Sequence, residues 1–448
     1  MIILSVLLGI VLGILTGLLP GLGTASLILS MYVWLYNFSM LEIFVFYCAL
    51  MSTIAYYGNV SSIIFGVHGE ITSGPAVDHG YTLYKNNTQD GYRALVYTAT
   101  SSFIAAIISL SIMLVVFSYV DIIIPFFGNT AKVIVLTLGL ALLITLSRNK
   151  LLGVLFAVFG ILLGKLGYDQ LFQIRLFTVD QSNILDSGVP FITVFTGIIV
   201  LPQLLEMIKT KRTQNILDIN DLKLSNRLKL LVNLPYAFSI MRGTTVGLIT
   251  GLIPGISYSI SSNVAAALEK KISDFKKLSK KDMHFSCVIS AESANNSAST
   301  IVLIPLMVLA IPIIASEAIV LSIAERSGFS IYTSADFLKN NGLMLIAIMF
   351  VVNTINWVLS GVFYSLVSKI FNFLQSFIYY FLFVIVIAMN YYAAGLTNQS
   401  LLATICLLIF FAIGVMFKDV NSKMVMVFAF FLADPIVNEY YRFWLLNF

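Results

Sequence analysis

Uninterrupted apolar segments of roughly membrane-spanning length constrain the fold of this chain more than any other feature of its sequence. A helix needs about 20 apolar residues to cross the hydrocarbon core of a bilayer. The segments that reach or approach this length are 96–120, 130–146, 151–166, 342–367, 377–394 and 401–417. Together with shorter or Gly/Pro-interrupted apolar runs, they predict about 10 to 12 membrane crossings or half-crossings.

The low content of charged residues supports this interpretation. Only 10% of the 448 residues are charged and 59% are hydrophobic, whereas a soluble domain carries about 25% charged residues. The outer surface of the folded chain is therefore expected to face lipid. The apolar runs are continuous rather than alternating, which favours helices over a membrane β-barrel. We predict an all-α polytopic membrane protein.

Two basic clusters predict cytoplasmic loops, because such loops carry an excess of Lys and Arg. One cluster lies in 209–229, the longest polar stretch of the chain. The other consists of Lys270, Lys271, Lys276, Lys277, Lys280 and Lys281. Apolar segments flank both clusters, which argues against nucleic-acid binding. Residues 1–19 lack a basic beginning and a small-residue cleavage site that leads into a soluble domain, so we interpret them as a retained first helix.

The two halves of the chain share a motif. Gly13-Ile-Leu-Thr-Gly17-Leu-Leu-Pro-Gly in the first half matches Gly247-Leu-Ile-Thr-Gly251-Leu-Ile-Pro-Gly in the second at every Gly, Thr and Pro. Internal duplication, often with inverted topology, is a common plan of secondary transporters. We therefore predict two membrane repeats with broken helices, at 1–208 and 230–448, joined by the basic cytoplasmic linker 209–229.

Each copy of the motif predicts a break in a membrane helix, because Pro removes a backbone donor and Gly tolerates unusual backbone angles. Bare amide groups are then expected where the next half-helix begins, and such helix starts bind anions. Two matched breaks predict a substrate site, and a kink that serves packing alone is the alternative. The candidate substrate-binding residues at the breaks are Pro20, Gly21, Gly23, Thr24, Pro254, Gly255 and Ser257.

A polar patch follows each break, at 56–62 and at 292–300. Amides and hydroxyls can donate to a carboxylate or bind sodium through oxygen, and close helix packing by small residues is the alternative. The candidate substrate ligands in the patches are Asn59, Ser61, Ser62, Asn295, Asn296 and Ser297. The candidate sodium ligands are Asn59, Asn295 and Ser299. Glu292 is a candidate for proton coupling, or else lies at the membrane edge.

A glycine-rich loop at 66–81 is too polar to span a membrane, and we expect it to close over a cavity or to line one. His68 and His79 within it either titrate near neutral pH or are simply solvated. The sequence holds no Ser/His/Asp set, no Cys/His cluster and no Walker-type phosphate loop. We therefore predict no enzymatic activity, no use of ATP by this chain alone, and no cofactor beyond a coupling Na⁺ or H⁺.

In the order of its motifs, the chain resembles the large permease subunit of the tripartite tricarboxylate transporters, the TctA-like proteins. The matching segments are 17–23, 57–62, 78–81, 91–95, 167–169, 175–178, 185–191, 251–257, 265–270, 292–297 and 434–439. The chain departs from the family pattern at 67–69, at 311–313 and by an insertion between Asp78 and Tyr81.

The resemblance implies a multi-pass protein of the inner membrane. It implies uptake of small organic anions, di- or tricarboxylates, driven by an ion gradient. It also implies two partners, a small membrane subunit and an extracytoplasmic solute-binding protein. A passive anion channel and a non-transporting membrane scaffold are the alternatives.

Overall fold

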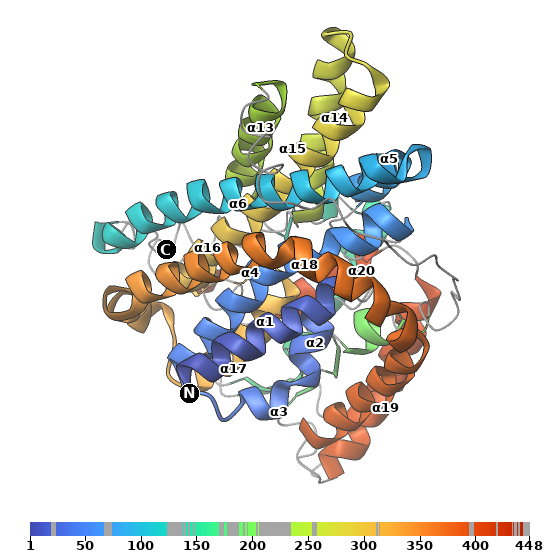
Figure 1. Ribbon diagram of the computed structural model, residues 1–448. Coiled ribbons are helices and arrows are strands. Elements are labelled where there is room, and N and C mark those ends of the chain that lie inside the picture. Colours follow the sequence, from blue (N-terminus) through green and yellow to red (C-terminus); the bar gives the residue numbers. More distant parts are fainter. Residues whose placement is uncertain are drawn as a thin grey trace.

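The structure is a computed structural model in which helices surround a large apolar core (Figure 1). It describes residues 1–18, 24–66, 74–122, 149–169, 174–176, 188–190, 196–202, 234–252, 258–310, 314–393, 398–417 and 420–431, together with a few isolated positions. In this part of the chain the only strands are β1 (Gly167–Asp169) and β2 (Ile174–Leu176), which pair antiparallel. The predicted all-α polytopic fold is confirmed, with this short strand pair as an addition that the sequence did not predict.

A first set of helices forms around a run of glycines. It consists of α1 (Ile2–Leu18), α2 (Thr24–Ser30), α3 (Tyr32–Leu35) and α4 (Met40–Phe65). A Cβ added at Gly13 would lie 2.6 Å from the Cβ of Thr53, and one at Gly17 would lie 2.7 Å from the backbone nitrogen of Gly58. Because later residues of α1 meet later residues of α4, the two helices run parallel. The segment that contains α2 and α3 therefore leads the chain back from the end of α1 to the start of α4.

A second set repeats this arrangement. It consists of α13 (Leu234–Thr250), α14 (Tyr258–Phe275) and α15 (Lys280–Ile301), which lie beside one another (Figure 1). Gly247 packs against the Ala294 carbonyl, and a Cβ at Gly251 would lie 2.9 Å from the Cα of Ala298. Helices α13 and α15 therefore run parallel, and α14 leads the chain back from the end of α13 to the start of α15. Gly247 and Gly251 are the motif counterparts of Gly13 and Gly17.

Each set receives a long helix from the other half of the chain. Helix α6 (Thr88–Ser118) packs along α15, where Asp90 pairs with Lys281 at 2.7 Å and the rings of Tyr97 and Phe285 lie 5.5 Å apart. These contacts proceed in the same order along both helices, so α6 and α15 run parallel.

Helix α18 (Ile331–Ala393) packs along α4 in the same way. The ring of Phe44 lies 5.2 Å from that of Phe337, and the ring of Tyr57 lies 6.2 Å from that of Tyr364. Helices α4 and α18 therefore run parallel as well.

The directions of α6 and α18 relate the two sets. Phe103 stacks on Trp357 with ring centroids 4.7 Å apart, whereas Phe117, further along α6, packs on Gly342, earlier in α18. Helices α6 and α18 are thus antiparallel, and α4 and α15 are antiparallel too. The two sets have the same internal packing and opposite directions, as inverted repeats do. The boundary at 209–229 stays a prediction, because that segment lies outside the described residues.

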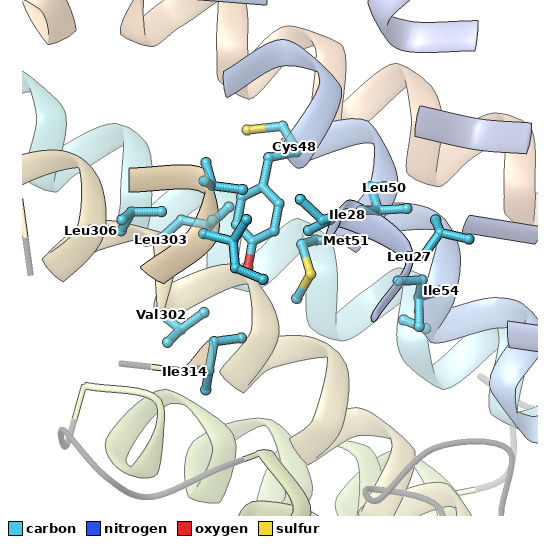
Figure 2. Packing of buried hydrophobic residues seen from close by; sticks show 14 of the residues in the cluster. Leu27, Ile28, Cys48, Leu50, Met51, Ile54, Val302, Leu303, Leu306 and Ile314 are labelled. Atoms are coloured by element: carbon cyan, nitrogen blue, oxygen red, sulfur yellow. The ribbon is translucent and has the colours of Figure 1, made fainter. Parts of the chain in front are cut away.

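The first set meets the segment that follows α15 in an apolar cluster (Figure 2). Ile28 of α2 and Met51 of α4 lie near Val302, Leu306 and Ile314. The remaining described helices are η2 (Ala76–Tyr81), α5 (Thr82–Asn86), α9 (Lys150–Gly164), η3 (Thr196–Val200), α16 (Leu303–Leu309), α17 (Ala315–Arg326), α19 (Asn398–Met416) and α20 (Val420–Phe431).

Three described helical segments are long and apolar enough to cross a membrane, namely Met40–Ile64, Thr88–Ser118 and Thr333–Ser360. Shorter apolar helices occur at Ile2–Gly17, Lys150–Gly164 and Leu402–Met416. The predicted total of about 10 to 12 crossings stays a prediction, because much of the chain between these helices is not described.

Replacement of Gly247 by leucine tests the glycine packing. The new side chain would collide with the Ala294 carbonyl and the Ser297 hydroxyl, and overpacking costs about 1–3 kcal/mol or more. We expect Gly247→Leu to lower the melting temperature of the detergent-purified protein. Thr245→Leu is the control, because it adds the same side chain at an exposed position of the same helix. Equal melting temperatures in both variants would contradict the packing described here.

A second prediction concerns an ion pair between α13 and α14. Arg242 Nε lies 2.8 Å from Glu269 Oε2, and the Ser239 hydroxyl donates to Glu269 Oε1 at 2.8 Å. Removing one partner of a buried pair costs about 3–5 kcal/mol, whereas replacing both partners costs far less. Arg242→Leu is expected to lower the melting temperature, and adding Glu269→Leu should recover part of the loss. No recovery in the double variant would show that the ion pair is not what fastens the two helices.

Candidate functional site

The two helix breaks lie at corresponding places in the two sets. The last described residues before them are Leu18 and Leu252, directly after the glycines that end the close packing of α1 and α13. The first described residues after them are Thr24, which begins α2 and is half-buried, and Tyr258, which begins α14. Six candidate residues at the breaks lie outside the described residues, namely Pro20, Gly21, Gly23, Pro254, Gly255 and Ser257.

The first polar patch lies on the buried C-terminal part of α4. The Asn59 amide donates to the Ala55 carbonyl at 3.4 Å, and the Ser62 hydroxyl donates to the Gly58 carbonyl at 3.2 Å. Side chains of this kind satisfy their donors on the preceding turn of their own helix, which permits them inside an apolar environment. The side chain of Ser61 lies outside the described part of α4.

The second polar patch lies on α15, which is buried along nearly its whole length. The Ser297 hydroxyl donates to the Thr244 carbonyl at 2.9 Å and so joins α15 to α13. Ser299 Oγ and Thr300 Oγ1 donate to the Asn296 carbonyl at 3.0 Å and 2.9 Å. Ser297 and Ser299 therefore have a packing role in this structure, whatever further ligand they bind.

Asn296 differs from these hydroxyls. Its side chain is 1% exposed, and its amide Nδ2 has no hydrogen-bond partner among the described residues. A buried donor left without a partner costs about 1–3 kcal/mol. Neighbouring Asn295 is 7% exposed. Among the candidate residues of the second patch, Asn296 therefore has an amide donor that remains available for a buried anion.

The two patches lie at different levels of the structure. Near the end of α4, Ile63 packs on Gly80 of η2. His79, the residue before Gly80, contacts His284 near the start of α15. Since α4 and α15 are antiparallel, Asn59 and Ser62 lie toward the beginning of α15, whereas Asn295 and Asn296 lie toward its end. That all of these residues surround one carboxylate remains a prediction.

Two buried acids belong to the interior of the second half. Glu292 is 1% exposed on α15, one helical turn before Asn296, so it is enclosed by protein rather than exposed at an edge. Glu317 is fully buried in the first turn of α17, where its Oε2 accepts from the Ile314 amide at 3.3 Å. Glu317 was not among the residues predicted from the sequence. The available signal was an acid just after a Pro-interrupted apolar run, since acids in membrane segments mark functional positions.

A polar cluster between α4 and α18 was not predicted from the sequence either. Tyr56 donates to Asn353 Oδ1 at 3.1 Å, and Asn356 donates to Thr53 Oγ1 at 3.1 Å. Asparagines three residues apart in the apolar run 342–367 were its signal. Such pairs hold membrane helices together, and this cluster joins the first set to α18.

The described residues contain no group of three or more His, Cys, Asp or Glu side chains that could hold a metal ion. The candidate sodium ligands Asn59 and Asn295 lie at different levels of α4 and α15, and Ser299 donates to the Asn296 carbonyl. A sodium site built from these three residues therefore stays a prediction.

Comparisons with known proteins agree with the resemblance seen in the sequence. The model of the tripartite tricarboxylate transporter TctA family matches residues 3–428. A protein of Agrobacterium vitis, described as an uncharacterized 52.8 kDa protein in the TAR-I ttuC' 3' region, is 26% identical over 262 residues. This match covers 57% of the chain and half of the length of that relative. No solved structure matches the chain.

The family match extends over nearly all of the chain, including both glycine-lined helices, both breaks and both polar patches. The apolar helices described above are consistent with the membrane location of a transporter. The chain is therefore a membrane protein of the tripartite tricarboxylate transporter TctA family.

Proposed function

We propose that this protein is the permease subunit of a secondary active transporter that carries small organic anions, di- or tricarboxylates, across the cell (inner) membrane. In this proposal an ion gradient drives uptake. An extracytoplasmic solute-binding protein delivers the substrate, and a small membrane subunit completes the assembly.

One observation carries the proposal. In two helix sets that run in opposite directions, the first helix ends next to a glycine of the shared motif, α1 at Leu18 after Gly17 and α13 at Thr250 before Gly251. The next described helix begins at Thr24 in one set and at Tyr258 in the other. Half-helices of inverted repeats present their N-termini to anionic substrates near the membrane midplane. The starts of α2 and α14, at Thr24 and Tyr258, would supply backbone amides of this kind.

Side-chain amides would complete the binding of the anion. Asn296 holds a buried donor that no described residue satisfies. Glu292, one turn away, is the candidate for proton coupling, and the oxygens of Asn59, Asn295 and Ser299 are the candidates for a coupling sodium ion. Each of α6 and α18 packs on the opposite set, so a rocking of one set against the other would carry the long helix of the other half with it.

Two alternatives make different predictions. A passive anion channel would equilibrate the anion and would not accumulate it. A membrane scaffold without transport activity would tolerate changes at Asn296. The continuous packing along α6 and α18 does not by itself decide between these functions, and the following two experiments do.

The first experiment measures uptake of labelled citrate and of smaller dicarboxylates into proteoliposomes that contain the permease, the small subunit and the solute-binding protein. Loss of one hydrogen bond to a charged ligand costs about 1.5–3 kcal/mol. We therefore expect Asn296→Ala to raise the half-saturating substrate concentration about tenfold or more. Asn341→Ala is the matched control, because the Asn341 amide donates to its own helix at Phe337. Unchanged uptake by Asn296→Ala would reject this site.

The second experiment tests the energy source. With an imposed sodium or proton gradient, we expect the internal substrate concentration to exceed the external one, and an ionophore that collapses the effective gradient should abolish the excess. Uptake that only ever reaches equal concentrations would favour the passive channel.

A further inference from the structure

Two of the three histidines of the chain meet at the boundary between the two helix sets. The Nδ1 atoms of His79 and His284 lie 2.9 Å apart, and their ring centroids lie 5.2 Å apart, although 205 positions separate the two residues in the sequence. His79 belongs to η2 and His284 to the second turn of α15. Both histidines lie outside the helical segments that are long enough to span a membrane.

The position of η2 makes this contact a link between the sets. On one side Gly80 fits against Ile63 of α4, where a Cβ would approach the Ile63 side chain to 2.6 Å. On the other side the histidine pair fixes η2 to α15. Gly66, which ends α4 with a φ of +62°, lies against the ring of Tyr81 and so holds the other end of η2 close to α4.

We propose that His79 and His284 form a proton-binding site between the two helix sets, and that a second proton bound there releases η2 from α15. The inference does not depend on the substrate or on the coupling ion. It follows from the number of hydrogen-bond donors and acceptors on the imidazole ring. A neutral ring has one donor and one acceptor nitrogen, whereas both nitrogens of a protonated ring are donors. The Nδ1–Nδ1 hydrogen bond therefore needs at least one neutral ring and is lost when both rings carry a charge.

The surroundings add positive charge to the site. Asp78 of η2, Lys270 of α14 and Lys280 of α15 act on the two rings. Of these groups only Asp78 favours a charged imidazole, and both lysines disfavour it.

The other elements packed against η2 contribute little net charge. Helix α6 presents Asp90, which pairs with Lys281 of α15 and contacts Arg93. Helix α5 carries the exposed Lys85, and α4 carries no charged residue after Glu42. On α15, Asp282 accepts from Tyr236 at 3.0 Å and from Ser279 at 2.7 Å. Among the described residues, the carboxylate that acts on the rings and favours a second proton is that of Asp78.

Burial and electrostatics act in the same direction. Burial, and after it the neighbouring His284, lowers the pKa of His79 to about 4, and burial lowers the pKa of His284 as well. A histidine whose pKa is lower in the folded state than its ordinary value of about 6.5 stabilises the fold fully above that value. The stabilisation is lost as the pH falls from about 6.5 toward 4. The site is thus intact at neutral pH and responds to acid.

The first test measures the melting temperature of the purified protein in detergent as a function of pH, which requires no substrate. The wild-type melting temperature should fall as the pH is lowered from about 6.5 toward 4, because histidines of the unfolded chain gain protons that the folded site excludes. His284→Gln should show about half of that fall or less, because a glutamine oxygen still accepts from a protonated His79. His79→Gln should behave in the same way. The double variant should show the smallest fall, because neither histidine of the pair remains to gain a proton.

Lys85→Gln is the matched control, because it removes a nearby charge but leaves the histidine pair intact, and its pH dependence should equal that of the wild type. A second measurement follows hydrogen exchange in the peptide that contains residues 76–86, corrected for the intrinsic effect of pH. Exchange there should rise on acidification in the wild type and stay low in His284→Gln. Identical pH dependence in the wild type and both histidine variants would overturn the proposal. A changed pH dependence without any carboxylate uptake would leave the proton site standing and reject the proposed transport function.

Discussion

The architecture of this protein depends on direct backbone contact between the first and last helices of each helix set, α1 with α4 and α13 with α15. Glycines four residues apart on α1 and on α13 leave no room for a Cβ, and α4 and α15 occupy the space. In a membrane, hydrocarbon surrounds apolar side chains whether the helices are associated or separate. Close packing of small residues is therefore a main source of helix association. The same contact holds the ends of α1 and α13 in place, directly before the two positions where the sequence predicts a break.

The long helices α6 and α18 join the two helix sets, because each packs on the set from the other half of the chain. Helix α6 packs on α15 and α18 packs on α4, and α6 and α18 cross each other through Phe103 and Trp357. Each half of the chain therefore completes the core of the other. Any movement of one set relative to the other has to change the contacts of α6 and α18, and also smaller contacts such as that of the histidine pair.

Much of this arrangement is encoded in local patterns, and some of it is not. The apolar runs and the duplicated Gly-x-x-Thr-Gly motif predict membrane helices, a repeat and two breaks, because hydropathy and glycine spacing are properties of single segments. The levels of Asn59 and Asn296 could not be predicted in this way, because they depend on the antiparallel relation of α4 and α15. Tyr56 and Asn353 are 297 positions apart, and His79 and His284 come from helices of different halves. Long-range pairs of this kind have no local signature. Glu317, in contrast, has a local signature, because it is an acid in an apolar region of the sequence.

The burial of α15 from Phe285 to Ile301 affects how this protein enters the membrane. Helices that contact lipid are recognised one at a time by their apolar surface. The run Ser-Ala-Glu-Ser-Ala-Asn-Asn-Ser at 290–297 offers almost no such surface, because protein rather than lipid surrounds it. Stable insertion of this segment therefore requires α6, α13 and α14 to be in place beside it. Biogenesis of the second half thus depends on a helix made much earlier in translation, and a hydropathy profile alone would leave α15 out of the membrane.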